Sequence, residues 1–260
     1  MSDQYSFSVP LPTATPVCTL IVAWQVFEAA PVCIAANRDE STDRPSTPPR
    51  VRNGDPAVLA PRDERAGGTW VGYNAEGVLA AVTNRWTAGE GERSRGLLVD
   101  DALGARSAAA AIDTVETALQ GTEYAPFHLL VADETDCLLV AHDGEGGTTH
   151  PLSPGVHVIV NVGFDGEWFV PERRPEVGRT QAENAERVRE TLRPREGETA
   201  EGWIGRAGAV LGDHEYGVCI HGDGFGTRSA SLIRLGDDRR FEYADGPPCE
   251  TAFRPIELGL

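Results

Sequence analysis

The chain has 260 residues, and 40 acidic residues against 23 basic ones give it a formal net charge of −17 at neutral pH. Every basic residue is an arginine, and a surface with this excess of carboxylates repels the phosphate backbone of nucleic acids. We therefore exclude nucleic acid as a partner. We interpret the acidity as an adaptation to high salt, with a GC-rich genome as the alternative explanation for the missing lysine.

The five cysteines are widely spaced and form no CxxC motif, which argues against a disulfide framework. The first residues lack the basic and apolar regions of a secretory signal, and no stretch approaches the roughly 18 apolar residues of a membrane span. We expect a soluble, reduced protein of the cytoplasm.

Residues 1–17 contain three prolines and several Ser and Thr, so we expect them to lie outside the fold, which then forms a single domain over 18–260. The apolar runs at 18–26 and 32–39 predict two strands that pair as a hairpin. Residues 40–66 are rich in Pro, Arg and Asp and predict a long loop.

The rest of the chain alternates between hairpin patterns and helical blocks. We predict a second hairpin over 67–85, a helical region over 94–119 with a helix start at Ser107, and a third hairpin from 127–133 and 136–144. We further predict a strand at 155–163, helices at 179–192 and 200–211, strands around a glycine-rich turn at 216–235, and a last strand at 239–245. Grouped hairpins and separate helices favour an α+β fold with antiparallel sheets over a parallel βαβ fold.

Cys18 is the first candidate for chemistry, because a thiolate is the strongest side-chain nucleophile at neutral pH once its pKa is lowered. A nearby arginine could lower the pKa, or the α-amine of Cys18 could take the proton if the chain began there. The alternative is a buried strand cysteine with a packing role.

The four polar residues Asn37, Arg38, Asp39 and Glu40 follow the second predicted strand directly. Since side chains alternate along a strand, Asn37 and Asp39 share one face and Arg38 and Glu40 share the other. Arg38 could hold a thiolate or an oxyanion, and Asp39 could accept a hydrogen bond from an α-ammonium or orient a substrate. A solvated strand end with internal salt bridges is the alternative.

Two other patterns suggest ligand contacts or oxyanion donors. Gly68 and Trp70 stand at a strand entrance, where glycine permits close backbone approach, although a tight turn with a core tryptophan explains them equally. Asn84 and Asn161 lie near strand ends, where asparagine serves as an oxyanion donor or as a turn residue.

Cys219 and His221 share a strand face near His214 and Asp223, which invites comparison with a metal site. Their spacing matches no standard zinc pattern, so we expect no metal here.

Several motifs together resemble the NRDE family, which is also named for transport and Golgi organisation protein 2. They are CTLIVAW at 18–24, NRDE at 37–40, RP at 44–45, GGTWVG at 67–72, AAVTN at 80–84, SRG at 94–96 and HGDGFGTRSAS at 221–231. The resemblance covers Cys18 to about Leu235. Family members are implicated in secretory-pathway organisation and in haem mobilisation.

That family is similar to N-terminal nucleophile hydrolases, especially the penicillin acylase and bile-salt hydrolase branch. The similarity implies a four-layer αββα sandwich of two antiparallel sheets between helices. It also implies amide hydrolysis by a cysteine that opens the mature chain and uses its own amine as base. By this resemblance we assign the catalytic residues as Cys18, Arg38, Asp39, Asn84, Asn161 and Arg228. We expect substrate binding by Asn37, Glu40, Gly68, Trp70 and His221.

A free amine on Cys18 requires that residues 1–17 be absent from the working protein. They are either a propeptide cleaved after Val17, or a misassigned start in which Val17 is the initiator methionine. The partner is then a small amide substrate, and no cofactor is expected. The alternatives are a carrier of haem or another hydrophobic molecule, with His214, His221 and Cys18 as candidate haem ligands, and an interaction scaffold with a degenerate site.

Overall fold

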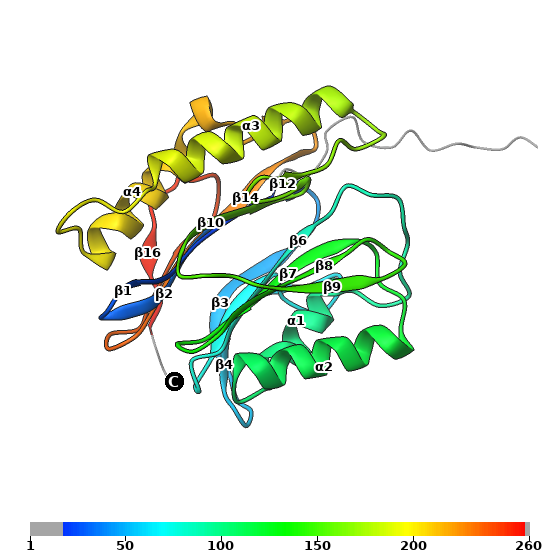
Figure 1. Cartoon of the computed structure of the whole chain (residues 1–260), viewed down its shortest axis with the longest axis horizontal. Coiled ribbons are helices and arrows are strands. Elements are labelled where there is room, and N and C mark those ends of the chain that lie inside the picture. The colour runs from blue at the N-terminus through cyan, green and yellow to red at the C-terminus, as the bar shows by residue number, and fades with distance from the viewer. Residues whose placement is uncertain (1–17, 258–260) are drawn as a thin grey trace, which may run out of the picture.

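The computed structural model describes residues 18–257, and these residues form four layers (Figure 1). Two antiparallel sheets pack face to face, with helices α3 (Pro175–Thr191) and α4 (Ala200–Gly212) covering one and α1 (Arg95–Leu103) and α2 (Ala108–Gly121) covering the other. The predicted α+β fold and αββα sandwich are therefore confirmed. The expectation for residues 1–17 lies outside the described residues.

The first sheet has nine strands among the described residues, in the order β12-β11-β10-β1-β2-β14-β15-β16, with β13 beside β14. Its strands are β1 (Thr19–Phe27), β2 (Ala30–Ser41), β10 (Gly155–Val160), β11 (Gly163–Phe164), β12 (Glu167–Trp168), β13 (His221–Gly222), β14 (Phe225–Leu235), β15 (Arg240–Ala244) and β16 (Arg254–Pro255). β2 lies near the middle and pairs with β1 on one side and β14 on the other. The predicted first hairpin is confirmed.

The second sheet has seven strands among residues 18–257, in chain order from β3 to β9. They are β3 (Ser46–Arg52), β4 (Val58–Asp63), β5 (Val71–Asn74), β6 (Leu79–Asn84), β7 (Phe127–Ala132), β8 (Cys137–His142) and β9 (Gly147–Pro151). The prediction of a long loop over 40–66 is wrong, because β3 and β4 lie within it. Proline is tolerated on an edge strand and at a bulge, and Pro48 and Pro49 occupy the irregularity of the edge strand β3.

The helical region predicted over 94–119 consists of two helices, each started by a serine. The Ser94 hydroxyl accepts a hydrogen bond from the Gly96 N–H, and the Ser107 hydroxyl accepts one from the Ala110 N–H, both at 3.2 Å. Ser107 is thus confirmed as a helix start. Among the described residues, no helix combines the length and the apolar character needed to cross a membrane.

Strand alternation divides the core into layers. On β1, Leu20 and Val22 pack between the two sheets, whereas Ile21 and Ala23 pack beneath α3 and α4. A third cluster lies between the second sheet and α1 and α2. Because most side chains of β1 and β2 belong to one of two buried layers, a shift of one residue in their pairing would exchange the layers.

Gly68 marks the contact between the second sheet and α1. A Cβ at Gly68 would lie 2.2 Å from the carbonyl carbon of Gly96, and the next N–H, that of Thr69, donates to the Gly96 carbonyl at 3.1 Å. The close approach expected at Gly68 is therefore an approach to the first turn of α1.

We predict that Gly68→Ala lowers the free energy of unfolding by about 1–3 kcal/mol or more, because two backbones must separate to admit the methyl group. Gly205→Ala is the matched control, since it adds the same atom to an exposed position of α4 where nothing lies within 4 Å. The control should raise the free energy of unfolding by up to about 1 kcal/mol through helix propensity. Urea denaturation followed by circular dichroism measures both, and equal effects would contradict the role of the Gly68–Gly96 contact.

Candidate active site

Cys18 lies at the start of β1, at one end of the first sheet. The following residue, Thr19, stands opposite Asn37 of β2 and opposite Val160 of β10, so the neighbours of Cys18 are the polar end of β2 and Asn161. The Cys18 thiol is half-buried, and its Sγ lies 3.8 Å from the backbone oxygen of Asp39. Pairing of three strands thus brings residues from three distant parts of the chain to one place.

The Cys18 thiol is held in its neutral form in this arrangement. The pKa of Cys18 is raised to about 12, chiefly by burial and then by the charges of Asp39 and Glu40, and the Asp39 backbone and the Arg38 guanidinium only partly oppose this rise. A thiol with such a pKa is a poor nucleophile at neutral pH. Activation of Cys18 therefore requires a proton acceptor that none of these side chains supplies.

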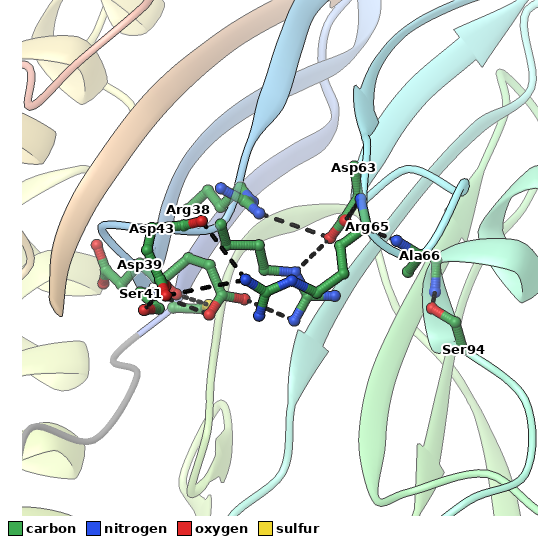
Figure 2. Close-up of polar contacts among 12 residues, drawn as sticks. Arg38, Asp39, Ser41, Asp43, Asp63, Arg65, Ala66 and Ser94 are labelled. Atoms are coloured by element: carbon green, nitrogen blue, oxygen red, sulfur yellow. Dashed lines mark hydrogen bonds and ion pairs between the residues drawn. The ribbon is translucent and has the colours of Figure 1, made fainter. Parts of the chain in front are cut away.

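Arg38 points into the space between the two sheets, where it is 6% exposed. Its Nη2 lies 3.6 Å from Asp63 Oδ2 on β4 (Figure 2). Its guanidinium carbon lies 4.4 Å from the centre of the Trp70 ring. Neither Nη1 nor Nη2 makes a hydrogen bond to any residue between 18 and 257. Arg38 therefore offers buried, charged donors to an oxygen of a ligand.

Asp63 organises the second-sheet side of the site (Figure 2). Its Oδ2 accepts a hydrogen bond from Arg44 Nε at 2.7 Å, and its Oδ1 accepts from the backbone N–H groups of Arg65 and Ala66 at 3.0 Å each. Arg44 in turn forms an ion pair with Glu40 at 3.3 Å. Glu40, assigned to substrate binding, thus belongs to a network that fixes Arg38 and the segment after β4.

Asp39 points to the opposite face of β2 from Arg38, as the alternation predicts, and it is 2% exposed. The hydroxyl of Thr227 on β14 donates to Asp39 Oδ1 at 2.5 Å, while Oδ2 has no hydrogen-bond partner within the described chain. Burial raises the pKa of Asp39 well above its usual value, and the Thr227 hydroxyl and Arg38 oppose this. An unfilled acceptor therefore lies beside Cys18.

Asn84 and Asn161 meet at this end of the sandwich. The Asn161 amide donates to the backbone oxygen of Asn84 at 2.7 Å, and its Oδ1 accepts from Gln181 of α3 at 2.9 Å. An amide nitrogen carries two hydrogens, so a second N–H of Asn161 remains for another acceptor. This contact joins the end of β6 in the second sheet to the end of β10 in the first, next to Cys18.

Two other assigned residues lie on β2 and β14. Asn37 donates to the carbonyls of Leu211 and Val218 at 3.0 and 2.7 Å, so its amide holds the segment after α4. Arg228 is exposed, at the irregularity of β14 opposite the Arg38–Asp39 segment.

His221 is exposed on β13, which is three strands from β1. At about 4.8 Å per strand, His221 and Cys18 are separated by about 14 Å. His214 packs its ring against that of His221, with 5.2 Å between centroids. The three side chains considered as haem ligands therefore do not meet at one site.

Arg95, the first residue of α1, is a site residue that sequence reasoning did not single out. It is half-buried, donates to the Pro126 carbonyl at 2.7 Å, and interacts electrostatically with Cys18. Burial lowers the pKa of Arg95, and the interaction with Cys18 opposes that shift. The SRG motif at 94–96 contained it, but only the fold shows that α1 begins near the thiol.

Comparison with known proteins identifies relatives in sequence. Residues 17–245 match the model of a family described as Transport and Golgi organisation 2. The human Transport and Golgi organization protein 2 homolog is 26% identical over 250 residues, which cover 82% of this chain and 84% of the human protein. A mouse Transport and Golgi organization 2 homolog is 30% identical over 145 residues, or 52% of each protein.

Comparison with solved structures identifies the fold. The penicillin V acylase of Agrobacterium tumefaciens aligns with a TM-score of 0.55 over 92% of this chain and 84% of the acylase, at 14% identity. The chain thus has the fold of the N-terminal nucleophile hydrolases, as the family resemblance implied.

The buried carboxyl of Asp39 predicts a specific dependence of stability on pH. A pKa raised above the usual 3.8 means that the folded chain holds this proton more tightly than the unfolded chain. The contribution of Asp39 to stability is therefore complete below pH of about 4 and is lost as the pH rises through the folded-state pKa.

We expect Asp39→Asn to remove this loss, so that the variant gains stability relative to the wild type between pH 5 and pH 8. Asp113→Asn, which removes an exposed carboxylate from α2, controls for the loss of one charge. Urea unfolding at both pH values measures the difference, and parallel pH profiles of wild type and Asp39→Asn would refute the assignment.

Proposed function

The chain belongs to the Transport and Golgi organisation 2 family, and on that premise we propose that it hydrolyses an amide bond with the Cys18 thiolate as nucleophile. The observation that carries the proposal is that buried donors of Arg38 and a buried acceptor of Asp39, all without hydrogen-bond partners in the described chain, lie near Cys18. The buried donors of Arg38 lie on one side of β2 and the unpartnered Oδ2 of Asp39 on the other. The similarity of the fold to an acylase supports the same reaction class.

The missing base is the α-amine of Cys18, in a working chain that begins at this residue. An α-amine has a pKa of about 8 and accepts a proton at neutral pH, which a peptide nitrogen does not. The resulting ammonium donates to Asp39 Oδ2, the acceptor that has no other partner in the described chain. This added positive charge also favours the ionised forms of Cys18 and Asp39 together.

In the proposed reaction the Cys18 sulfur attacks the amide carbonyl carbon, and its proton passes to the α-amine. The negative oxygen accepts hydrogen bonds from the free N–H of Asn161 and from Arg38, with Asn84 as a further donor. The ammonium then protonates the leaving nitrogen, and the amine product departs from a thioester. Water, deprotonated by the same amine, hydrolyses the thioester and restores the thiol.

The substrate lies between the sheets on the Arg38 side of β2. The Trp70 ring, over which the Arg38 guanidinium lies, forms one side of this space. The exposed Arg228 can bind a polar or anionic group of the substrate. Arg95 places a second guanidinium near the sulfur, where its charge favours the thiolate. A small amide with an apolar acyl group and a polar end fits this distribution.

We expect Cys18 to react with iodoacetamide at pH 7 at least about tenfold faster in a chain that begins at Cys18 than in the 260-residue chain, because only the former has the base. Peptide mass spectrometry measures the rate at each cysteine. Cys137 is the internal reference, since burial raises its pKa to about 12 in both chains. If Cys18 in the shorter chain is no faster than Cys137, the nucleophile proposal fails.

Hydrolysis is tested on the shorter chain with penicillin V and N-acyl anilides as probe substrates. Cys18→Ala should abolish product formation, and Asp39→Asn should lower kcat by roughly 10²-fold or more by misplacing the base. Cys137→Ala, which removes a different thiol, is the matched control and should retain activity. Equal turnover by the Cys18→Ala variant would rule out covalent catalysis by this residue.

A further inference from the structure

A second cluster of reactive side chains lies at the outer edge of the first sheet, separate from Cys18. The ligating atoms of His214, Cys219, His221 and Cys249 all lie within 4.8 Å of one another. The whole chain has six histidines and five cysteines, so four of these eleven residues converge at one point. Three are exposed and Cys219 is buried, so the cluster is open to ions in solution.

The four residues come from three separate segments. His214 opens a short 3-10 helix after α4, Cys219 and His221 flank the start of β13, and Cys249 lies in the turn before β16. The sequence pattern joins Cys219 and His221 to His214 and Asp223, and it misses Cys249, which lies 28 residues beyond His221. Asp223 is not among the clustered residues.

The spacing of the atoms suits a tetrahedral metal ion. Zinc bonds of about 2.3 Å to sulfur and about 2.0 Å to nitrogen place neighbouring ligand atoms about 3.5–3.8 Å apart. The observed distances are 3.5 Å between the two sulfurs, 3.9 Å from Cys219 Sγ to His221 Nε2, and 3.1 Å from His221 Nε2 to Cys249 Sγ. Shifts of a few tenths of an ångström would bring these three atoms to the expected separations. The pairs that include His214 lie within 4.8 Å, so its ring would have to move by up to about 1 Å to complete the set.

We propose that His214, Cys219, His221 and Cys249 bind one zinc ion as a structural site. Two thiolates and two neutral imidazoles form a preferred zinc ligand set, and the two thiolate charges balance the charge of the ion. Four protein ligands leave no open position for a water or a substrate, so the site is structural and not catalytic. The proposal does not depend on amide hydrolysis or on a free amine at Cys18.

The metal would fasten the C-terminal turn to the sheet. A Cβ at Gly212, the last residue of α4, would lie 3.2 Å from the backbone nitrogen of Cys249, so the turn already lies against the end of α4. Thiolate and imidazole bonds to one ion would connect this turn to β13. Removing the metal should therefore loosen the turn that carries Cys249 and the segment that leads into β13.

The same ion would support Asp39 through two hydrogen bonds. Ile220, between the ligands Cys219 and His221, donates its N–H to the Thr227 hydroxyl at 2.9 Å, and its carbonyl accepts from the Thr227 N–H at 2.9 Å. The Thr227 hydroxyl donates to Asp39. A metal-bound segment therefore positions the threonine that orients the Asp39 carboxyl.

A disulfide between Cys219 and Cys249 is the competing state. The sulfurs are 3.5 Å apart, and bond formation at about 2.05 Å would consume both thiolates that the metal needs. Zinc binding and this disulfide exclude each other in any one molecule, because both use the sulfurs of Cys219 and Cys249.

The test uses the full 260-residue chain without a histidine tag, purified under reducing conditions with zinc in the medium. Elemental analysis should find about one zinc per chain. Replacement with Co²⁺ should give the visible absorption of a tetrahedral site and a thiolate-to-cobalt band in the near ultraviolet. Zinc should also raise Tm relative to the chelator-treated chain.

Cys249→Ser should lower zinc affinity at least about tenfold and should abolish the zinc-dependent rise in Tm. Cys137→Ala and His150→Ala, which remove one cysteine and one histidine elsewhere, are the matched controls and should bind as the wild type does. His221→Cys keeps a soft ligand at the same place, and it should retain Co²⁺ with a stronger thiolate-to-cobalt band even if Cys249→Ser folds poorly.

The proposal is overturned if the reduced wild-type chain binds no zinc at micromolar concentration, or if Cys249→Ser binds it as tightly as the wild type does. Recovery of a Cys219–Cys249 disulfide in place of metal, from cells lysed under thiol-blocking conditions, would overturn it as well. None of these outcomes depends on the alkylation rate of Cys18, so failure of the hydrolase proposal remains a separate result.

Discussion

The antiparallel pairing of β2 with β1 and β14 is the constraint on which both sites depend. β2 is twelve residues long, and β14 pairs along its polar end as far as Ser41, whereas the pairing with β1 stops at Asn37, next to Cys18. Strand alternation directs Arg38 between the sheets and Asp39 toward the helices. The register places Thr227 opposite Asp39, and Cys18 directly precedes the first paired residue of β1. Strand pairing alone therefore brings the Cys18 thiol close to Arg38 and Asp39.

Burial disfavours the charged form of each group that this pairing collects. The Cys18 thiol and the Asp39 carboxyl both become harder to ionise, since removing water penalises each negative charge. The charge of Arg38 is compensated by Glu40 on its own strand and by Asp63 on the other sheet, and its guanidinium also lies over the Trp70 ring. A positively charged hydrogen-bond donor between the Cys18 sulfur and the Asp39 carboxyl would lower the pKa of both groups. This is the electrostatic argument for an α-ammonium at Cys18.

Local patterns predicted the hairpins, the helix start at Ser107 and the opposite faces of Arg38 and Asp39, because these depend on periods of two and on a serine cap. They failed over 40–66, where prolines that argue against a central strand are tolerated at an edge. Asp63 and Arg95 could not be predicted, since they reach the site only through packing between sheets and helices. Cys249 was overlooked for the same reason, because no spacing rule connects a turn residue to a ligand 28 positions earlier.

Asn37 and Asp39, the two residues of the NRDE motif that face the helices, connect the candidate active site to the proposed metal site. Asn37 binds the carbonyls of Leu211 and Val218, and Asp39 binds Thr227, which holds Ile220. Residues 211–227 are thus folded over the end of β2 by the same motif that presents Arg38 to the other face. This segment includes exposed turns at 213–215 and 221–224, and exposed turns are prone to local opening. Metal bonds at His214, Cys219 and His221 would resist that opening where the carboxyl of Asp39 needs a fixed partner.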